Sequence, residues 1–436
     1  MICLYVDNFR GFTKTLIPIK DVNFFVGENS TGKTSILGLI SLLSSSQFWM
    51  SQDFDFNDLG FIRFSDIVSV NSKNKKYFTI GLISTSPIKN KDNLKMNSFM
   101  MTFIKKDGLP RLQVYTYNHG NKIIRVRLTE KFVKYKFRDF PKIKNYEDFC
   151  ENIYLNWSEE HHTDKTGFSL LKIDLAMEVP VPILSSIIED ILLEKPPKRP
   201  QRISFSLPFF RTEIAWIAPI RTKPRRTYDA YKMNFSSAGD HTPYIINKIM
   251  DDKKESKEFL DYINRIGLRS GLYKGIKVNR FGKKNTAPFE LDVVIGKNEI
   301  SICCVGYGVS QSLPVIVESF MRPKGSWIGI QQPEVHLHPK AQAALGDTFF
   351  EIAQTEKKKF LIETHSDYMI NRFRINYRKI DNKESLPDSQ ILFFERSDNG
   401  NKAYQLEIND NGDLPDNQPT GYRDFFIKEE LDILGF

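Results

Sequence analysis

The chain has 436 residues, which is long enough for a large hydrophobic core and for more than one domain. Hydrophobic residues make up 41% of it and charged residues 26%, a composition that argues against the disordered and fibrous classes. Lys and Arg number 62 against 53 Asp and Glu, an excess that permits contact with nucleic acid without indicating it. No apolar run approaches the roughly 18 residues of a membrane span, so no membrane contact is expected.

The cysteines and the N-terminal residues indicate the cellular compartment in which the protein is expected. None of the four cysteines (Cys3, Cys150, Cys303 and Cys304) belongs to a C-x-x-C pair, so neither a zinc site nor a disulfide framework is expected. The first ten residues lack the basic and then apolar layout of a secretion signal. Together these features predict a protein of the reducing cytoplasm.

A phosphate-binding loop is predicted near the N-terminus. Two strands are expected within residues 1–27, and an apolar helix is expected over residues 35–43. Between them lies G-E-N-S-T-G-K-T, whose glycines allow backbone N–H groups to turn inward around phosphate oxygens. Lys33 would supply a charge to the phosphates, and the Thr34 hydroxyl a ligand to Mg²⁺. A glycine-rich turn would explain Gly27 and Gly32 but not Lys33 and Thr34. The predicted ATP-binding residues are Gly27, Asn29, Ser30, Thr31, Gly32, Lys33, Thr34 and Ser35.

The middle of the chain is strongly basic. Strand-like pieces alternate with turns to about residue 120, and residues 121–144 are then rich in Lys and Arg, interleaved with Phe132, Tyr135, Phe137 and Phe140. In one interpretation the cations contact nucleic-acid phosphates and the rings stack on bases. In the other, the rings face a core and the lysines are only solvated. A helix is expected near residues 183–193.

The last part predicts alternating strands and helices. A strand at 214–220 runs into R-T-K-P-R-R, and a charged amphipathic helix follows over residues 243–266. Strands at 301–305, 327–330 and 360–364 each precede a helix, which favours a largely parallel sheet covered on both faces. An N-G turn predicts a hairpin over residues 391–408. Arg221, Lys223, Arg225 and Arg226 form a second basic cluster that could contact nucleic acid, an acidic partner or ATP phosphates across an interface.

Three distal stretches resemble the chromosome-maintenance branch of the ABC ATPases, which contains RecF, the SMC proteins and the OLD nucleases. V-G-Y-G-V-S-Q-S-L-P resembles the signature stretch, I-Q-Q-P-E-V-H-L-H-P the Walker B segment, and E-T-H-S the switch histidine. N-F-R-G-F, W-I-A-P-I-R-T-K-P-R-R, G-D-H-T-P-Y and G-Y-R-D-F-F resemble the ATPases of bacterial anti-phage systems, most of all the Septu type. The resemblance covers roughly residues 1–70 and 213–436. No N-K-x-D tetrapeptide is present, so a GTPase is not expected.

The resemblance implies an α/β fold, an ABC-type, SMC/RecF-like P-loop ATPase head with an inserted α/β arm. The expected parts are residues 1–120 and 211–436 for the head and 121–210 for the arm. Such heads work as dimers or higher homo-oligomers around ATP and Mg²⁺. Ser310, with the backbone at Gly308, would cap the γ phosphate of the partner copy, and His365 would sense that phosphate. Alternatively, Ser310 is an ordinary helix N-cap and His365 caps the next helix.

The chain departs from the resembled family at two positions. An acidic residue at position 331 would hold Mg²⁺ through water, and Glu at position 332 would polarise the attacking water. Gln331 and Gln332 stand there instead, and an amide can coordinate weakly but cannot accept a proton near pH 7. Loss of a general base typically costs about a hundred- to ten-thousand-fold in rate. Glu334 is the nearby carboxylate that could substitute, so we expect intact binding and slow hydrolysis.

Three functions remain open at this point. No nuclease constellation is found in the sequence, so an anti-phage ATPase would need a separate effector nuclease, with the HNH class as one candidate. The second hypothesis is a RecF-like repair or recombination ATPase that binds DNA through residues 121–144. The third is a catalytically dead assembly protein with a purely structural nucleotide. His336 and His338 could share one side of an extended segment, but without a third ligand they do not predict a metal site.

Overall fold

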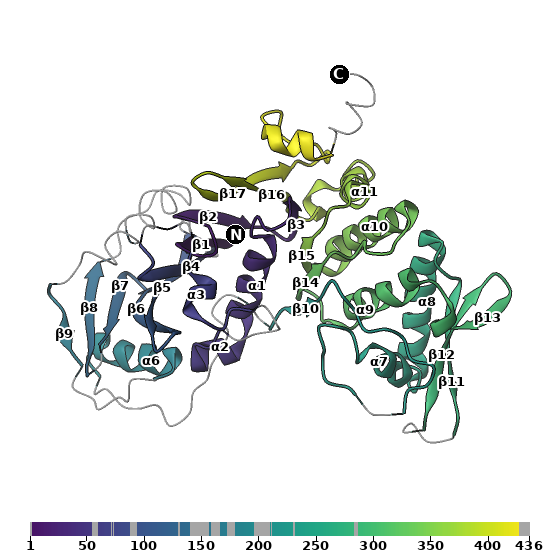
Figure 1. The fold of residues 1–436 in the computed structure, drawn as a ribbon, viewed down its shortest axis with the longest axis horizontal. Coiled ribbons are helices and arrows are strands. Elements are labelled where there is room, and N and C mark those ends of the chain that lie inside the picture. Colours follow the sequence, from purple (N-terminus) through teal and green to yellow (C-terminus); the bar gives the residue numbers. More distant parts are fainter. Residues whose placement is uncertain are drawn as a thin grey trace. The chain divides into compact units, whose positions relative to one another are not determined.

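The structure, a computed structural model, describes residues 2–54, 60–70, 72, 74–87, 94–129, 131–139, 157, 166–171, 179–195, 210, 212–229, 232–282 and 287–426. It divides into two compact units (Figure 1). The first unit comprises Met1–Ile19, Asn29–Glu213 and Phe394–Ala403. The second unit comprises Lys20–Glu28, Ile214–Phe393 and Tyr404–Phe436.

An antiparallel sheet is the centre of the first unit. Among the described residues its order is β2-β1-β4-β5-β6-β7-β8-β9, and each neighbouring pair is antiparallel. The strands are β1 (Ile2–Asp7), β2 (Thr15–Ile19), β4 (Tyr77–Pro87), β5 (Leu94–Lys106), β6 (Leu109–His119), β7 (Lys122–Leu128), β8 (Val133–Asp139) and β9 (Ser169–Leu170). The boundary expected at residue 120 therefore falls inside one continuous sheet. Most of the remaining expected arm lies outside the described residues.

Helices pack in the same unit as this sheet. They are α1 (Lys33–Ser44), α2 (Ser46–Ser51), α3 (Phe64–Ile67) and α6 (Val181–Leu192), so the helices expected after the P-loop and near residue 183 are confirmed. Nearly all of α1 is buried, which explains its apolar sequence. Ser45 ends α1 and caps α2 by accepting a hydrogen bond from the Gln47 N–H.

A mostly parallel sheet is the centre of the second unit. Its order is β10-β14-β15-β3-β16-β17, and β10, β14, β15 and β3 are mutually parallel, as the strand and helix alternation predicts. The first 27 residues contain three strands rather than the expected two, because β2 precedes β3. The N-G hairpin is confirmed as β16 and β17, which run from the second unit into the first. The bounds are β3 (Val22–Gly27), β10 (Ala215–Ile217), β14 (Trp327–Gln331), β15 (Lys359–Glu363), β16 (Ser389–Ser397) and β17 (Gly400–Ile408).

Helices and a small second sheet complete this unit. The helices are α7 (Thr242–Ile249), α8 (Lys253–Ser270), α9 (Tyr307–Met321), α10 (Pro339–Glu356) and α11 (Asp367–Tyr377). The small sheet contains β11 (Gly275–Arg280), β12 (Phe289–Ile295) and β13 (Asn298–Ser301), and short 3-10 turns span Ile302–Cys304 and Lys383–Ser385.

Two sequence predictions about this unit were wrong. The single helix expected over residues 243–266 is two helices, because Asp252 leaves the helical conformation and accepts hydrogen bonds from the N–H groups of Lys254 and Glu255. The stretch S-I-C-C-V forms the end of β13 and a 3-10 turn rather than one buried strand. In the part of the chain that the structure describes, no helix combines the length and the apolar character that a membrane crossing requires.

Candidate nucleotide-binding site

The P-loop is shaped by its glycines. Strand β3 ends at Gly27 and helix α1 begins at Lys33, two residues before the predicted start of the helix. Gly32 has a left-handed φ of 97°, and a Cβ added there would lie 2.4 Å from the Phe12 ring, so only glycine fits. Ser30 also has a positive φ, of 63°. The loop therefore turns tightly against Phe12 before the helix starts.

The start of α1 suits an anion. A helix of 12 residues directs backbone N–H groups and the positive end of its dipole outward at its N-terminus. The N-cap residue is Gly32, which has no side chain to cap those groups. Lys33 and Thr31 are buried, so their side chains are held by the protein rather than solvated. This geometry fits bound phosphate.

A hollow in the first unit adjoins the P-loop. It contains about 760 Å³ of space that protein atoms do not fill, and Arg10, Ser30, Asp66 and Arg396 are among its lining residues. Arg10 donates from Nε to Ser35 Oγ at 3.2 Å, and Arg396 donates from Nη2 to the Ser30 carbonyl at 2.9 Å. Burial lowers the pKa of Arg10, with Asp66 opposing the shift, but an arginine stays charged at neutral pH.

These flanking arginines were not predicted as site residues. The sequence offered one signal, the stretch N-F-R-G-F, which contains Arg10. Arg396 gave none, because it reaches Ser30 only through the fold, across 366 positions of the sequence.

The second unit gathers carboxylates at the carboxyl ends of β14 and β15. Gln331 and Glu363 end these two parallel strands, are paired in register, and are both buried. Gln331 donates from Nε2 to Glu363 Oε2 at 3.0 Å. Glu363 is also paired with Phe25 of β3, two residues before the P-loop begins. A carboxylate therefore lies directly beside position 331 although the residue there is an amide. No role was predicted for Glu363 from the sequence.

Glu334 follows β14 in the loop to α10. Its Oε1 accepts a hydrogen bond of 2.7 Å from the His365 N–H, whereas its Oε2 is buried and has no hydrogen-bond partner among the described residues. Burial raises the pKa of Glu334, although the hydrogen bond from His365 opposes this shift. Gln332, with a left-handed φ of 41°, donates from its backbone to the Glu363 carbonyl at 2.7 Å. Glu334, Gln332 and His365 therefore lie at one edge of the sheet, and their catalytic roles stay predictions.

Arg221 connects two predicted motifs. Its guanidinium donates from Nη1 to the Gln311 carbonyl at 3.1 Å and from Nη2 to the Gln331 carbonyl at 2.9 Å. The Gln311 amide bonds in return to the Arg221 backbone N–H and carbonyl, each at 3.2 Å. Burial lowers the pKa of Arg221 to about 10, and Glu334 opposes the shift. The residue is 3% exposed, so its grouping with a surface cluster was wrong, whereas Lys223, Arg225 and Arg226 are exposed.

The capping alternatives for Ser310 and His365 are not what the structure shows. Helix α9 begins at Tyr307 with Gly306 as its N-cap, and Ser310 lies one turn inside, donating from Oγ to the Tyr307 carbonyl at 3.1 Å. Helix α11 is capped by Ser366, not by His365. A Cβ at Gly308 would lie 2.8 Å from the His336 carbonyl, so α9 packs closely on the loop after β14. The roles of Gly308 and Ser310 toward a partner's nucleotide stay predictions.

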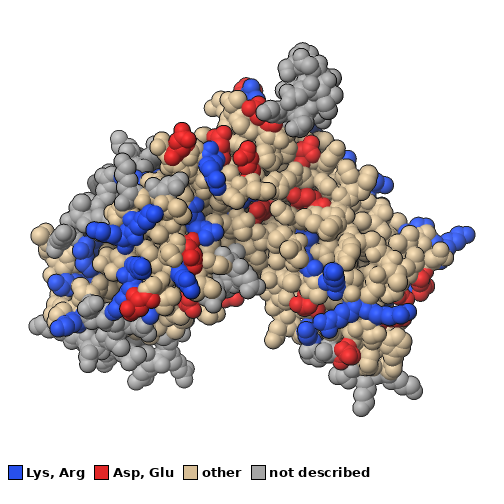
Figure 2. Space-filling model, in the orientation of Figure 1, with Lys and Arg blue, Asp and Glu red and all other residues tan. Residues whose placement is uncertain are grey.

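The basic segment of the first unit has a mixed character. Along β8, Lys134, Lys136 and Arg138 alternate with the half-buried rings of Tyr135 and Phe137. Figure 2 shows Lys and Arg side chains gathered over the part of the sheet that contains β7 and β8. Arg125 is buried instead, Phe132 is 52% exposed, and Phe140 lies outside the described residues. Contact between residues 121–144 and DNA stays a prediction.

Comparison with known proteins identifies the family. The model of the AAA ATPase domain family matches residues 1–370. The chain belongs to this ATPase family. No curated protein sequence matches it. As a member, it is a P-loop ATPase, and its α/β fold class is confirmed.

Solved structures also resemble this family member, at low identity. The SMC head domain from Pyrococcus furiosus bound to the C-terminal domain of ScpA is 10% identical, with a TM-score of 0.40 and coverage of 100% of this chain and 99% of that chain. The SMC head domain from Thermotoga maritima is 11% identical, with a TM-score of 0.37 and coverage of 93% and 98%. The recombination mediator protein RecF is 10% identical, with a TM-score of 0.32 and coverage of 92% and 97%.

Two separate sets of residues have a chemistry that suits phosphate or a cation. The first unit presents the start of α1 and the arginine-lined hollow, which suit phosphates. The second unit presents Glu334, with one buried carboxylate oxygen that no described residue satisfies, and the neighbouring Glu363. Oxygen ligands of this kind are those that Mg²⁺ prefers. The start of α1 therefore fits phosphate, and the two carboxylates of the second unit fit a cation such as Mg²⁺.

Proposed function

We propose that the chain binds ATP with Mg²⁺ and hydrolyses it slowly, as the regulatory and scaffold subunit of a cytoplasmic anti-phage complex that holds a separate nuclease. The observation that carries ATP binding is the uncapped start of α1 at Gly32 and Lys33. Slow hydrolysis is supported by the two amides at Gln331 and Gln332, where the resembled family has carboxylates. The anti-phage role is supported by the resemblance to Septu-type ATPases.

The binding roles follow from the residues. Lys33 neutralises the phosphates that the first turn of α1 holds, and the Thr34 hydroxyl provides an oxygen ligand to Mg²⁺. Bound Mg²⁺ supplies charge stabilisation to the phosphates. Arg10 and Arg396 add two cations at the hollow beside the loop. These contacts require no carboxylate at position 331 or 332, so binding survives their loss.

Hydrolysis depends on the remaining carboxylates. Glu334 is the proton acceptor of this proposal, because a buried carboxylate with a raised pKa is a stronger base than an exposed one. Glu363, held by Gln331, places negative charge beside the metal-binding position. His365 holds Glu334 in place through its backbone N–H. The arrangement replaces the family's paired acids with carboxylates from other positions.

The P-loop assignment is tested with Lys33→Ala in the full chain. Titration with a fluorescent ATP analogue should give saturable binding to the parent and at least about a hundredfold weaker binding to the variant, because one charge-assisted contact to each of two phosphates is lost. Lys257→Ala, on the exposed face of α8, is the matched control and should bind like the parent. Equal affinity of parent and Lys33→Ala would remove the assignment.

The partner role is tested by co-expression with the products of neighbouring genes. Native mass spectrometry of the purified chain should show a complex that contains several copies of this chain and a nuclease, HNH type or other. A chain that purifies alone under these conditions, with nuclease present in the same cells, contradicts the scaffold role.

A RecF-like DNA-binding ATPase is the second candidate, favoured by the three cations of β8, of which Arg138 is exposed and Lys134 and Lys136 are half-buried. If it is correct, the isolated chain should bind DNA with an affinity that falls steeply as salt rises. Neutralising Lys134, Lys136 and Arg138 together should reduce the salt dependence. Insensitivity of DNA binding to this triple change would count against the candidate.

A further inference from the structure

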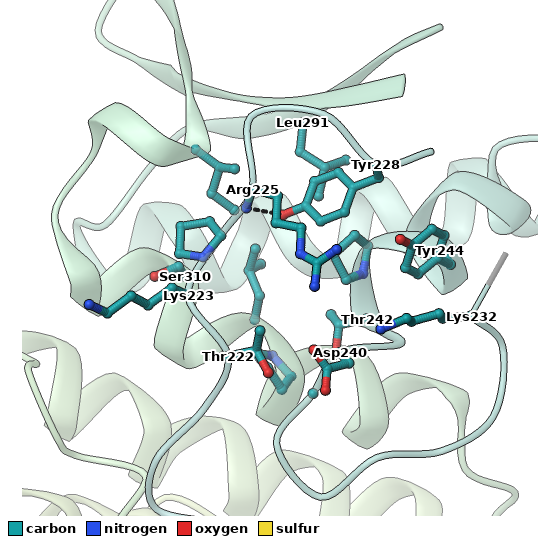
Figure 3. A pocket seen from close by; sticks show the side chains of 16 residues that line it. Thr222, Lys223, Arg225, Tyr228, Lys232, Asp240, Thr242, Tyr244, Leu291 and Ser310 are labelled. Atoms are coloured by element: carbon teal, nitrogen blue, oxygen red, sulfur yellow. Dashed lines mark hydrogen bonds between the residues drawn. The ribbon is translucent and has the colours of Figure 1, made fainter. Parts of the chain in front are cut away.

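Two stretches of the sequence outside the P-loop meet at one pocket of the second unit. Residues 222–225 belong to its lining, and so do Gly239, Asp240 and residues 242–244; Figure 3 labels several of them. These are most of R-T-K-P-R-R and G-D-H-T-P-Y. The pocket is partly open, and the roughly 500 Å³ of space that its atoms leave unfilled includes open solvent.

The rim of this pocket, here called the basic pocket, is positively charged. Lys223, Arg225 and Lys232 are exposed side chains of its lining, and no described residue forms an ion pair or side-chain hydrogen bond with any of them. Asp240 is the one acidic residue of the lining, and it accepts a hydrogen bond from Ser236 at 3.4 Å. Three cations and one carboxylate leave a net charge of about +2 at pH 7.

A buried hydroxyl in the lining lacks a partner. Thr242 is 2% exposed, and its Oγ1 makes no hydrogen bond within the described part of the chain. Buried polar atoms of this kind normally have a partner. Thr242 is also the first residue of α7, whose N-terminal end favours negative charge.

The side chain of the residue before Thr242 is not available as a hydrogen-bond partner for the Thr242 hydroxyl. His241, the N-cap position of α7, uses Nδ1 to accept from the Ser236 N–H at 3.2 Å and bonds through Nε2 to Glu318 Oε1 at 2.6 Å. Its ring is therefore occupied on both nitrogens, and it fixes the loop that carries Asp240 and Thr242.

The inner part of the basic pocket is apolar. Leu291, Ile302 and Leu313 are almost fully buried there, and the rings of Tyr228 and Tyr244 stand beside them. Gly239 has a φ of 80°, and a Cβ added there would lie 2.5 Å from Pro314. The backbone at Gly239 therefore packs directly against α9, and a larger residue would not fit. Such a surface accommodates a carbon-rich or ring-shaped ligand body.

We infer that the basic pocket binds a small phosphate ester with an apolar or aromatic body. The rim charge of about +2 matches a phosphate monoester, which carries about −1.5 to −2 at pH 7. Arg225 and the lysines contact the phosphate oxygens, the Thr242 hydroxyl donates to one of them, and the body occupies the apolar interior. The lining of the basic pocket contains no residue of the P-loop, but it includes Ser310, the residue expected to act on a partner copy's nucleotide.

The experiment uses the full chain with Lys33→Ala, so that P-loop binding does not contribute. Calorimetric titration with adenosine 5′-monophosphate and with phenyl phosphate should give saturable binding of one molecule per chain for at least one probe. Adenosine, which lacks the phosphate, and inorganic phosphate, which lacks the organic group, should each bind at least about tenfold more weakly. Each can make only one of the two contacts, either with the apolar interior or with the charged rim.

Three further variants locate the binding. Arg225→Gln and Thr242→Val should each weaken the better probe at least about tenfold, as expected when one contact to a charged group is lost. Arg226→Gln is the matched control, because Arg226 is an exposed neighbour outside the pocket lining, and it should leave affinity unchanged. Arg225 is also exposed, so its replacement tests binding rather than folding.

The contrary results are equally definite. The inference is overturned if neither organic phosphate binds saturably, if inorganic phosphate binds as tightly as both, or if Arg226→Gln weakens binding as much as Arg225→Gln. None of these results bears on ATP binding, because the Lys33→Ala background tests the basic pocket alone.

Discussion

Glu334 presents one oxygen held by the His365 N–H and one that is buried and unsatisfied within the described residues. An unsatisfied buried oxygen costs stability, and such a cost is typical of residues that act on a ligand. At the scale of single residues, this carboxylate is therefore the one whose replacement should separate catalysis from binding.

We expect Glu334→Gln to lower the rate of phosphate release about a hundred- to ten-thousand-fold while ATP affinity changes little, because an amide cannot accept the proton. The rate is measured on purified chain with saturating ATP and Mg²⁺. Glu258→Gln, on the exposed face of α8, should keep the parent rate. Hydrolysis by Glu334→Gln at the parent rate would exclude Glu334 as the proton acceptor.

The pH dependence of stability follows from the same raised pKa. The folded chain holds the Glu334 proton to higher pH than the unfolded chain does, so the stability that this group contributes is full at acidic pH. It is lost as the pH rises from the ordinary glutamate pKa through the raised one. The melting temperature of Glu334→Gln minus that of the parent should therefore increase from acidic to neutral buffer. A constant difference across that range would contradict a raised pKa.

Replacing Arg221 by another cation should destabilise the fold, because its charge alone does not replace its hydrogen bonds. Arg221→Lys cannot reach both the Gln311 and the Gln331 carbonyls, and losing bonds from a buried charged group should cost about 2–4 kcal/mol of unfolding free energy. Urea denaturation measures this loss. Arg226→Lys, at an exposed position, should change stability by less than about 0.5 kcal/mol. Equal midpoints for the two variants would show that the Arg221 bridge is unimportant.

At the scale of elements, the close packing of α10 on α11 links the loop that contains Glu334 to the loop that contains His365. Gly346 of α10 permits this approach, because a Cβ there would lie 2.3 Å from the Met369 carbonyl of α11. The helices must separate if the glycine gains a side chain.

We expect Gly346→Ala to destabilise the chain by about 1–3 kcal/mol through overpacking. Thermal and urea unfolding measure the change. The matched control is Gly306→Ala, whose added Cβ meets no atom within 4 Å. If both alanines lower stability equally, the effect belongs to the loss of glycine and not to helix contact.

The sequence predicted the presence of most helices and strands better than it predicted where they end and which strands pair. Helices α1, α9, α10 and α11 follow from apolar periodicity, and the parallel strands from their short apolar runs between helices. The break at Asp252 was missed because the amphipathic pattern continues across it, although Asp252 is itself a recognisable N-cap. Strand β2 was missed because its five residues include Pro18, which lowers strand propensity.

The site was predictable only where its residues are adjacent in the sequence. The P-loop is one such stretch. Glu363 is beside Gln331 only because β14 and β15 pair, and Arg221 reaches Gln311 and Gln331 across 90 and 110 positions. Contacts of this length depend on the tertiary fold, which local patterns do not specify.

At the scale of the whole molecule, ATP should join copies of the chain if Ser310 and Gly308 act on a partner's nucleotide. Light scattering after size exclusion should show a larger mass with ATP and Mg²⁺ than without nucleotide. Lys33→Ala should stay at the smaller mass under both conditions, since binding precedes association. A nucleotide-independent mass for the parent would contradict association through ATP.

The pairing of Gln331 with Glu363 has a consequence for any attempt to change the hydrolysis rate by placing an acid at position 331. Gln331→Glu would set two carboxylates side by side, where the amide now donates at 3.0 Å. Two carboxyl groups so close cannot both ionise readily. Either one of them would keep its proton, or the repulsion between them would push the two strands apart. Gln331→Glu alone should therefore lower the melting temperature, and the double variant Gln331→Glu with Glu363→Gln should recover it. The two positions have to be exchanged as a pair.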